Sequence, residues 1–473
     1  MYLGVMEVNK TILSTMIAGA LLVSACNSTG GKTAVSKNEV AAVETTSNTN
    51  VTAGISKGDK LATLSTYASI ASANYSDTLK DAKALQVAIT DFSKNPTEKT
   101  LQVAKDAWLV SRESYGTTEI FRLSNGPIDA EDGWVAETYG GVEGELNSWP
   151  LDENMIDYTI DANNKRTSGN IIDTTGMFTP GGEDVTAVDV TTLTPEVLGE
   201  LNTNGGDANV AAGYHAIEFM LWGQDQDYNN MIEDTITNGA MTAGQRPVTD
   251  FTTDKFAKRR LDYLNAVADK MVEDLTVVAS AWDDKVNGDK GLYRAALLDQ
   301  LTGEQASKNI DPAVSLKQIF AGVGVFSKSE LANERIAVAV LTPSEEDEHS
   351  CFSDNTHRDI ALNYQGIKNV LLGEYKGKKV GPAFIDNLST EEQAAISKLM
   401  ADIETRIEKI NTLATTTMHF DYQIRPENKD SVQNIVTLKN QLRRLGDQMV
   451  IVSKAYGISL TTNDVTDAEE TQI

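Results

Sequence analysis

The sequence predicts an all-α protein made of two antiparallel helical bundles packed together. Apolar residues recur at helical spacing along most of the chain, strand signals are few, and breaks rich in proline and glycine separate the helical segments. Helices joined by such breaks pack most simply as antiparallel bundles. We also expect long irregular insertions between some helices, with room for a small hairpin.

The N-terminus has the pattern of a secretory signal. A lysine precedes an apolar run over residues 11–25, which is too short and too abruptly ended to span a membrane. Ser24 and Ala25 stand directly before Cys26, which resembles a bacterial lipoprotein signal with Cys26 as the lipid-bearing first residue. Simple cleavage that leaves Cys26 free is the alternative. Asn27 after the cysteine favours the outer membrane by the same resemblance.

We therefore expect residues 1–25 to be a signal peptide. The protein would be lipid-anchored on the periplasmic side of the bacterial cell envelope, and the anchor would be its only membrane contact. Residues 26–58 are rich in Ser, Thr, Asn, Ala and Gly and have no sustained apolar stripe. This composition predicts a disordered tether that lifts the body off the membrane.

The composition fits a soluble, acidic body behind that tether. The 473 residues are enough for two domains, and 41 Lys and Arg stand against 68 Asp and Glu, a net charge of -27. This charge repels nucleic acid, so we expect no nucleic-acid partner. With Cys26 lipidated, Cys351 is left alone and no intramolecular disulfide is possible.

Residues 59–248 are predicted to form the N-terminal bundle, which ends with a short apolar helix. Apolar residues recur at helical spacing from Leu61 to Leu85, and Pro96 is placed to open the next helix. That helix is predicted to run from Leu101 to Arg122, before Asn125-Gly126-Pro127. The following residues, up to 207, are turn-rich and irregular.

Residues 249–462 are predicted to form the C-terminal bundle, after a break that ends at Pro247. The polar tail, residues 463–473, is predicted to fray. The helices of this bundle are expected at residues 256–282, 314–320, 329–340, 356–372, 390–413 and 432–455.

The short apolar helix at Gly213–Gly223 carries one imidazole and one carboxylate. His215 and Glu218 are three residues apart and therefore project from the same helix face. Two such groups in an apolar helix cost desolvation free energy unless a partner compensates them. That partner could be a metal ion or a polar ligand, or simply a His–Glu or His–backbone hydrogen bond inside a core.

A second segment, residues 345–357, holds His349 and His357 among carboxylates that include Asp354. It could supply ligands to the site begun by the apolar helix, or it could be a solvated acidic loop that caps the next helix. The run at residues 225–229 mimics the start of an EF-hand loop but lacks the later glycine and glutamate, so we discard it. No HExxH motif is present, and a zinc site would need its third ligand from afar.

These residues carry a family resemblance. Gly213-Tyr214-His215-Ala216-Ile217-Glu218 fits the GxHxxE signature of the imelysin-like proteins, also called the imelysin peptidase family. Three further blocks, at residues 115–129, 143–158 and 346–359, resemble the branch called iron-regulated protein A. The resemblance implies a two-bundle envelope protein associated with iron acquisition, with its motif in a cleft near the domain junction.

The resemblance implies that the protein binds iron, or an iron complex, and assists its uptake. His215 and Glu218 would contact the metal, and further groups would complete a shell of nitrogen and oxygen, which suits iron, with zinc as the alternative. The candidates for completing the shell are His349, His357, Glu119 and Asp354. Candidates for the wall of the cleft are Gly213, Trp222, Arg112 and Arg246, and the two arginines could hold an anionic iron chelate.

Two other functions stay open at this point. The family name implies a metal-dependent peptidase, in which Glu218 would be a ligand or a general base, although the motif lacks the second histidine of known zinc peptidases. A non-catalytic adaptor that docks an outer-membrane transporter is the third interpretation. The sequence leaves open whether the ligand would be free iron, a chelate or haem.

Overall fold

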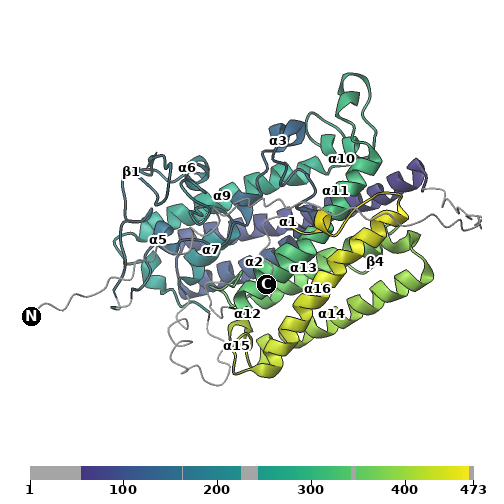
Figure 1. The fold of residues 1–473 in the computed structure, drawn as a ribbon. Helices are drawn as coiled ribbons and strands as arrows, with labels where there is room; N and C mark the ends of the chain where they lie inside the picture. The colour runs from purple at the N-terminus through teal and green to yellow at the C-terminus, as the bar shows by residue number, and fades with distance from the viewer. Residues whose placement is uncertain (1–54, 162, 164, 225–242, 342–347, 468–473) are drawn as a thin grey trace, which may run out of the picture. The chain divides into compact units, whose positions relative to one another are not determined.

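The computed structural model describes residues 55–161, 163, 165–224, 243–341 and 348–467. Residues 53–473 form one compact unit. The predicted all-α class is confirmed, because the described ranges are dominated by helices and contain only two short two-stranded sheets (Figure 1). The signal peptide, Cys26, most of the tether and the run at 225–229 lie outside the described residues.

The first part of the chain forms a long helix hairpin. Ser56 caps the first helix, and Thr97 forms a capping box with Thr100 at the start of the second. The second helix ends at Tyr115, earlier than predicted, and the backbone of Gly116 after it lies so close to Leu362 that a Cβ on Gly116 would be 2.8 Å from the Cβ of Leu362. The elements are α1 (Lys57–Lys94), α2 (Glu98–Tyr115) and the 3-10 helix η1 (Glu119–Phe121).

An irregular segment follows, as predicted, and it contains the expected small hairpin. Its two strands pair antiparallel, with Met177 opposite Asp189. The segment leads into the apolar motif helix. Its elements are α3 (Gly133–Tyr139), α4 (Glu143–Leu146), α5 (Glu153–Ile156), β1 (Met177–Phe178), β2 (Val188–Asp189), α6 (Pro195–Leu201) and α7 (Gly213–Trp222).

The helix α9 (Ala257–Ala281) begins after residue 248, where the N-terminal bundle was predicted to end. It nevertheless packs against α1, α6 and α7, which precede that residue. Figure 1 shows it alongside α1. Short elements surround it in sequence. They are η2 (Val248–Phe251), α10 (Leu292–Leu297) and η3 (Gly303–Lys308).

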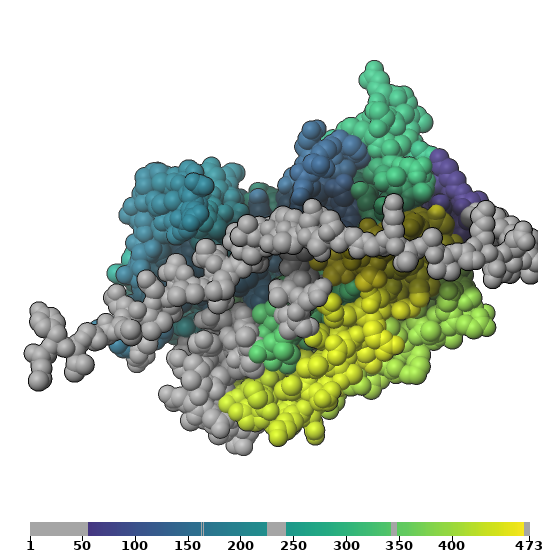
Figure 2. All heavy atoms as spheres, viewed as in Figure 1, coloured from purple at the N-terminus to yellow at the C-terminus, as the bar shows by residue number. Residues whose placement is uncertain are grey.

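The second part of the chain packs around α16, which contacts α11, η4 and α14. Figure 2 shows α14 and α16 side by side on one face. The predicted frayed tail starts with a short helix whose Val465 is buried. The elements are α11 (Pro312–Val325), the π-helix η4 (Phe326–Ala337), α12 (Val338–Leu341), α13 (Thr356–Leu372), β3 (Glu374–Tyr375), β4 (Lys378–Lys379), η6 (Phe384–Asn387), α14 (Thr390–Thr416), α15 (Phe420–Gln423), α16 (Lys429–Ala455) and η7 (Asn463–Val465).

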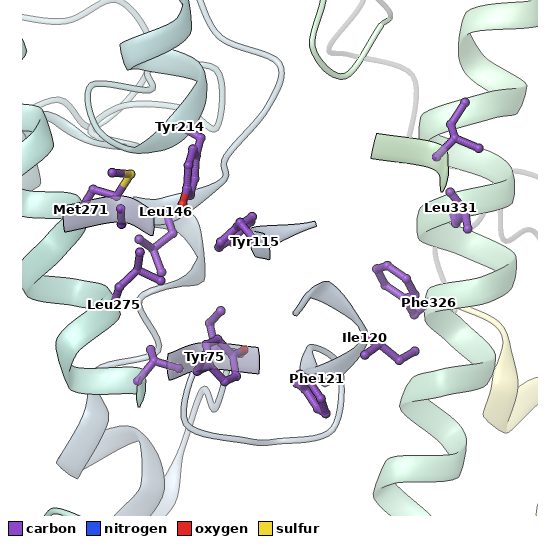
Figure 3. Packing of buried hydrophobic residues seen from close by; sticks show 14 of the residues in the cluster. Tyr75, Tyr115, Ile120, Phe121, Leu146, Tyr214, Met271, Leu275, Phe326 and Leu331 are labelled. Atoms are coloured by element: carbon purple, nitrogen blue, oxygen red, sulfur yellow. The ribbon is translucent and has the colours of Figure 1, made fainter. Parts of the chain in front are cut away.

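One hydrophobic core connects the two parts of the chain. Figure 3 shows Tyr75 and Tyr115 on one side and Phe326 of η4 on the other, with Phe121 of η1 between them. The motif helix α7 packs on α2 and α9 within this core. None of the helices in the described ranges is long and apolar enough to cross a membrane.

Candidate functional site

The glycine of the GxHxxE motif seats α7 against α4. Gly213 has φ +89°, and a Cβ on it would lie 2.5 Å from the carbonyl oxygen of Leu146. Only glycine tolerates both the left-handed backbone and this close approach. Gly213 was predicted to line a cleft, but its contacts give it a structural role, which fixes where His215 and Glu218 point.

His215 and Glu218 bind one another inside the core. His215 Nδ1 lies 2.9 Å from Glu218 Oε2, and both side chains are buried. The other carboxylate oxygen, Oε1, accepts two hydrogen bonds from Ser353, at 3.0 Å from the backbone N–H and at 2.6 Å from the hydroxyl. Both oxygens of Glu218 are therefore engaged. The carboxylate is placed to orient the ring of His215, as carboxylates do for metal-binding histidines.

Burial governs the charge of this pair. It raises the pKa of Glu218 to about 8, helped by the nearby charge of Asp359 and opposed by the Ser353 hydrogen bonds. It also lowers the pKa of His215 well below its ordinary value, and the charges of Arg112 and Arg335 act in the same direction. Both groups are therefore neutral near pH 7. A cation that bound the imidazole would displace a proton from the pair.

His349 brings a second imidazole to His215. The ring centroids lie 4.6 Å apart at an interplanar angle of 70°, and Trp149 packs at the edge of His349 with a centroid distance of 5.7 Å. Nε2 of His215 and both ring nitrogens of His349 are buried and make no hydrogen bond to any described residue. Burial lowers the pKa of His349 well below its ordinary value. These two neutral rings, the imidazole pair, therefore present nitrogen atoms that lack a partner.

Glu119 lies in a separate ion network. Its carboxylate is 2.5 Å from Nη2 of Arg335 and accepts hydrogen bonds from Asn147 at 3.2 Å and from Asn363 at 3.1 Å. Although burial acts to raise it, the charges of Arg335 and Arg112 hold the pKa of Glu119 below its ordinary value. Glu119 thus pairs with arginines, and among the described residues its contacts do not include His215 or His349.

Arg112 is also engaged within the protein. It pairs with Asp359 at 2.8 Å and donates to Asn147 Oδ1 at 2.6 Å, and it is fully buried. From the sequence we expected Arg112 to line the wall of a cleft and to hold an anionic chelate. Its charge is instead balanced by buried carboxylates, and it adds to the effect of burial in lowering the pKa of His215.

Asp354 and His357 turn away from the imidazole pair. His357 Nδ1 lies 3.1 Å from the carbonyl oxygen of Asp354, and the Asp354 carboxylate lies 3.2 Å from Nδ1 of His419. Asp421 contacts the same nitrogen. In the described part of the chain, Asp354, His419 and Asp421 are the one group of three potential metal ligands whose ligand atoms all lie within 4.8 Å of one another. The sequence analysis did not predict Asp421 as a ligand. Its position two residues after His419 was the pattern that could have indicated it.

Arg246 and Trp222 lie near the C-terminal end of α7. Nη1 of Arg246 lies 2.6 Å from Asp157 and 3.4 Å from Asp250, and the arginine lines a cavity of about 200 Å³ with Arg166. Trp222 packs edge-to-face on Trp108 with a centroid distance of 5.3 Å. It is therefore a core residue.

The sequence of the whole body matches a known family. A family model described as Imelysin, Peptidase M75, matches residues 71–449. The chain belongs to the imelysin family. A curated relative, iron-regulated protein A of Synechococcus elongatus, is 22% identical over 301 residues, which cover 64% of this chain and 61% of that protein. The chain thus spans less than two thirds of the length of this relative.

Solved structures of imelysin-like proteins share the fold. A crystal structure described as an iron-regulated protein A precursor from Parabacteroides distasonis has a TM-score of 0.56 at 16% identity, covering 86% of this chain and 97% of that chain. An imelysin-like protein from Psychrobacter arcticus has a TM-score of 0.52 at 13% identity, covering 86% and 98%. At such identities the likeness shows the fold alone. The resemblance predicted from the motif helix is confirmed.

Proposed function

We propose that this imelysin-family protein binds iron, as the ion or as a small chelate, at the imidazole pair and assists its uptake. The observation that carries the proposal is the set of ring nitrogens on His215 and His349 that are buried without a hydrogen-bond partner among the described residues. A buried polar atom without a partner costs about 1–3 kcal/mol. A bound cation would remove this cost, and relatives of this chain are named for iron regulation.

The chemistry of the pair suits a borderline metal ion. Imidazole nitrogens bind iron and zinc well, and Glu218 would hold His215 with Nε2 turned to the metal. In this arrangement Glu218 is a positioning residue, since His215 and Ser353 engage its two oxygens. A shell with only two protein nitrogens would leave positions for oxygen atoms of a chelate. Because the protein would supply only two ligands, such a shell would allow the iron to be released as well as bound.

The same engagement argues against the peptidase interpretation. A general base needs a carboxylate oxygen within reach of the attacking water. In this structure His215 and Ser353 contact the oxygens of Glu218. We therefore favour binding over hydrolysis.

The proposed site of action is the periplasmic side of the envelope. Cys26 would carry the lipid anchor, and an outer-membrane transporter would be the partner. Replacement of Cys26 with serine should abolish incorporation of labelled palmitate and move the protein to the soluble fraction. Retention of the label in this variant would rule out Cys26 as the lipidation site.

Metal analysis of the purified full chain tests the binding site. The parent and a His215→Ala/His349→Ala variant would be incubated with Fe(II) without oxygen, with Fe(III) citrate and with Zn(II), and then desalted. We expect the double variant to hold one equivalent of iron less than the parent, while His357→Ala, another buried histidine, holds as much. Equal iron in a folded double variant would overturn the proposal, and zinc-dependent peptide hydrolysis lost with His215 would favour the peptidase.

A further inference from the structure

A second cluster of ligand-type groups lies where the segment before α13 meets the linker between α14 and α15. Nδ1 of His419 is 3.2 Å from Oδ1 of Asp354 and closer still to Oδ1 of Asp421. Glu348 lies near enough for the charges of Asp421 and Asp354 to act on its carboxylate, although only Asp354, His419 and Asp421 have ligand atoms that all lie within 4.8 Å of one another. All four side chains are at most 9% exposed. We call these four residues the acidic cluster.

The cluster is built on a rigid linker. Gln423 donates hydrogen bonds to the carbonyl oxygens of Ile410 and Met418, at 3.0 and 2.9 Å, which fixes the turn that carries His419 and Asp421. The ring of His419 packs edge-to-face on Tyr422 with a centroid distance of 4.3 Å. The imidazole and the carboxylates are therefore held in place by their surroundings.

Two of these carboxylates, those of Asp421 and Glu348, have oxygen atoms without a hydrogen-bond donor among the described residues. One ring nitrogen of His419 faces two aspartates, and it carries at most one proton. Both oxygens of Asp421 and Oε1 of Glu348 are buried, and the described residues give them no well-aligned hydrogen bond. Buried carboxylates without donors are costly, and carboxylates that share a site repel one another.

We propose that the acidic cluster is a cation site, in which Asp354, Asp421 and His419 bind a divalent or trivalent transition-metal ion beside the carboxylate of Glu348. Two carboxylates and one imidazole suit a hard or borderline ion such as Mn(II) or iron, and they disfavour Cu(I). The cation would sit between Asp354, Asp421 and His419, whose ligand atoms all lie within 4.8 Å of one another. It would neutralise charges that the surrounding core cannot solvate.

The acidic cluster is distinct from the imidazole pair but connected to it along the chain. Ser353, which binds Glu218, directly precedes Asp354, which contacts His419. His349 of the pair directly follows Glu348 of the cluster. A cation in the cluster would therefore tighten the segment that also holds the imidazole pair. Together with the iron site proposed above at the imidazole pair, on which this count rests, the protein would bind two metal ions per chain.

Equilibrium dialysis of the full chain against Mn(II), and against Fe(II) without oxygen, tests the site. Asp421→Asn keeps the shape of the side chain and removes its charge, and Asp430→Asn is the matched control on an exposed aspartate. We expect Asp421→Asn to lose one bound equivalent and Asp430→Asn to lose none. Equal binding by Asp421→Asn and the parent would overturn the proposal.

The His215→Ala/His349→Ala variant provides an independent measurement, because it leaves the acidic cluster intact. We expect it to retain one equivalent of Mn(II) and to melt at a higher temperature when Mn(II) is added. Absence of both effects would overturn the acidic-cluster proposal even if Asp421→Asn failed to fold. A failed imidazole site would instead appear as unchanged metal content in this double variant relative to the parent.

Discussion

Ser353 donates two hydrogen bonds to the same carboxylate oxygen of Glu218, one from its backbone N–H at 3.0 Å and one from its hydroxyl at 2.6 Å. This contact joins the segment before α13 to the motif helix α7, which are far apart in sequence. It also leaves the second oxygen of Glu218 for His215. The orientation of the GxHxxE imidazole thus depends on a serine outside the motif.

Replacement of Ser353 with alanine should weaken this connection. The variant loses one hydrogen bond to a buried carboxyl group, and we expect the free energy of unfolding to fall by about 1–3 kcal/mol. Urea denaturation measures the change. Ser148→Ala is the control, because its hydroxyl bonds only the carbonyl of Gly144 in its own turn, and it should cost about 1 kcal/mol. Equal losses in both variants would show that the Glu218 contact adds no stability.

Gly213→Ala should be among the most damaging single changes in the chain. An alanine at this position would have to adopt the unfavourable left-handed φ of +89°. Its Cβ would also lie 2.5 Å from the carbonyl oxygen of Leu146. Gly133 also has a positive φ, +70°, but no neighbouring atom of the described residues would lie within 4 Å of a Cβ placed there. Gly133→Ala should therefore cost about 1–2 kcal/mol from the backbone alone, and Gly213→Ala about 1–3 kcal/mol more from overpacking.

Thermal and urea unfolding of both glycine variants would test this difference. A Gly213→Ala protein as stable as Gly133→Ala would mean that α7 can shift away from α4 at little cost. The motif glycine would then need another explanation.

Local patterns predicted the fold class and the motif helix, whereas tertiary contacts decided the rest. The apolar periodicity marked α1, α9 and α16 because burial of one face leaves a repeat in the sequence. The sequence did not predict the end of α2 at Tyr115, after which Gly116 packs against Leu362 from a distant part of the chain. Such distant contacts leave no local pattern in the sequence. For the same reason the sequence could not exclude Glu119 as a ligand, since its arginine partners come from other elements.

The candidate site was also predicted in part from local sequence patterns and depended in part on tertiary contacts. The three-residue spacing on one helix predicted that His215 and Glu218 share a face, and the structure realises the alternative of a direct hydrogen bond between them. His349 joins them, but Asp354 joins His419 and Asp421 through a contact across the fold. His349 and Asp354 are close together in sequence, yet they belong to different clusters. The sequence alone does not show this division, because it depends on how the backbone folds after residue 348.

The buried imidazole of His357 should make the metal-free protein less stable in acid. Burial, with a contribution from Arg358, lowers the pKa of His357 to about 4 from 6.5. Below pH 6.5 the unfolded chain binds a proton that the native ring excludes, so stability falls as the pH drops from 6.5 to about 4 and this contribution then levels off. His357→Gln removes the effect. The stability gap between parent and variant should narrow by about 2 kcal/mol from pH 7.5 to pH 4.5.

Urea denaturation of both proteins at the two pH values, with a metal chelator present, measures this gap. Since the other histidines titrate in both proteins, their contributions cancel in the difference. A gap of the same size at both pH values would show that His357 titrates alike in the native and unfolded states.

Glu119→Gln should destabilise the protein without changing its metal content. The substitution leaves the buried cation of Arg335, 2.5 Å from the carboxylate, without its main counter-charge, and such a loss costs about 3–5 kcal/mol. A Glu119→Gln/Arg335→Met double variant removes both charges and should recover part of this loss. Denaturation of the two single variants and the double variant gives the coupling energy. Additive losses, or loss of a bound iron equivalent in a folded Glu119→Gln protein, would return Glu119 to the candidate metal ligands.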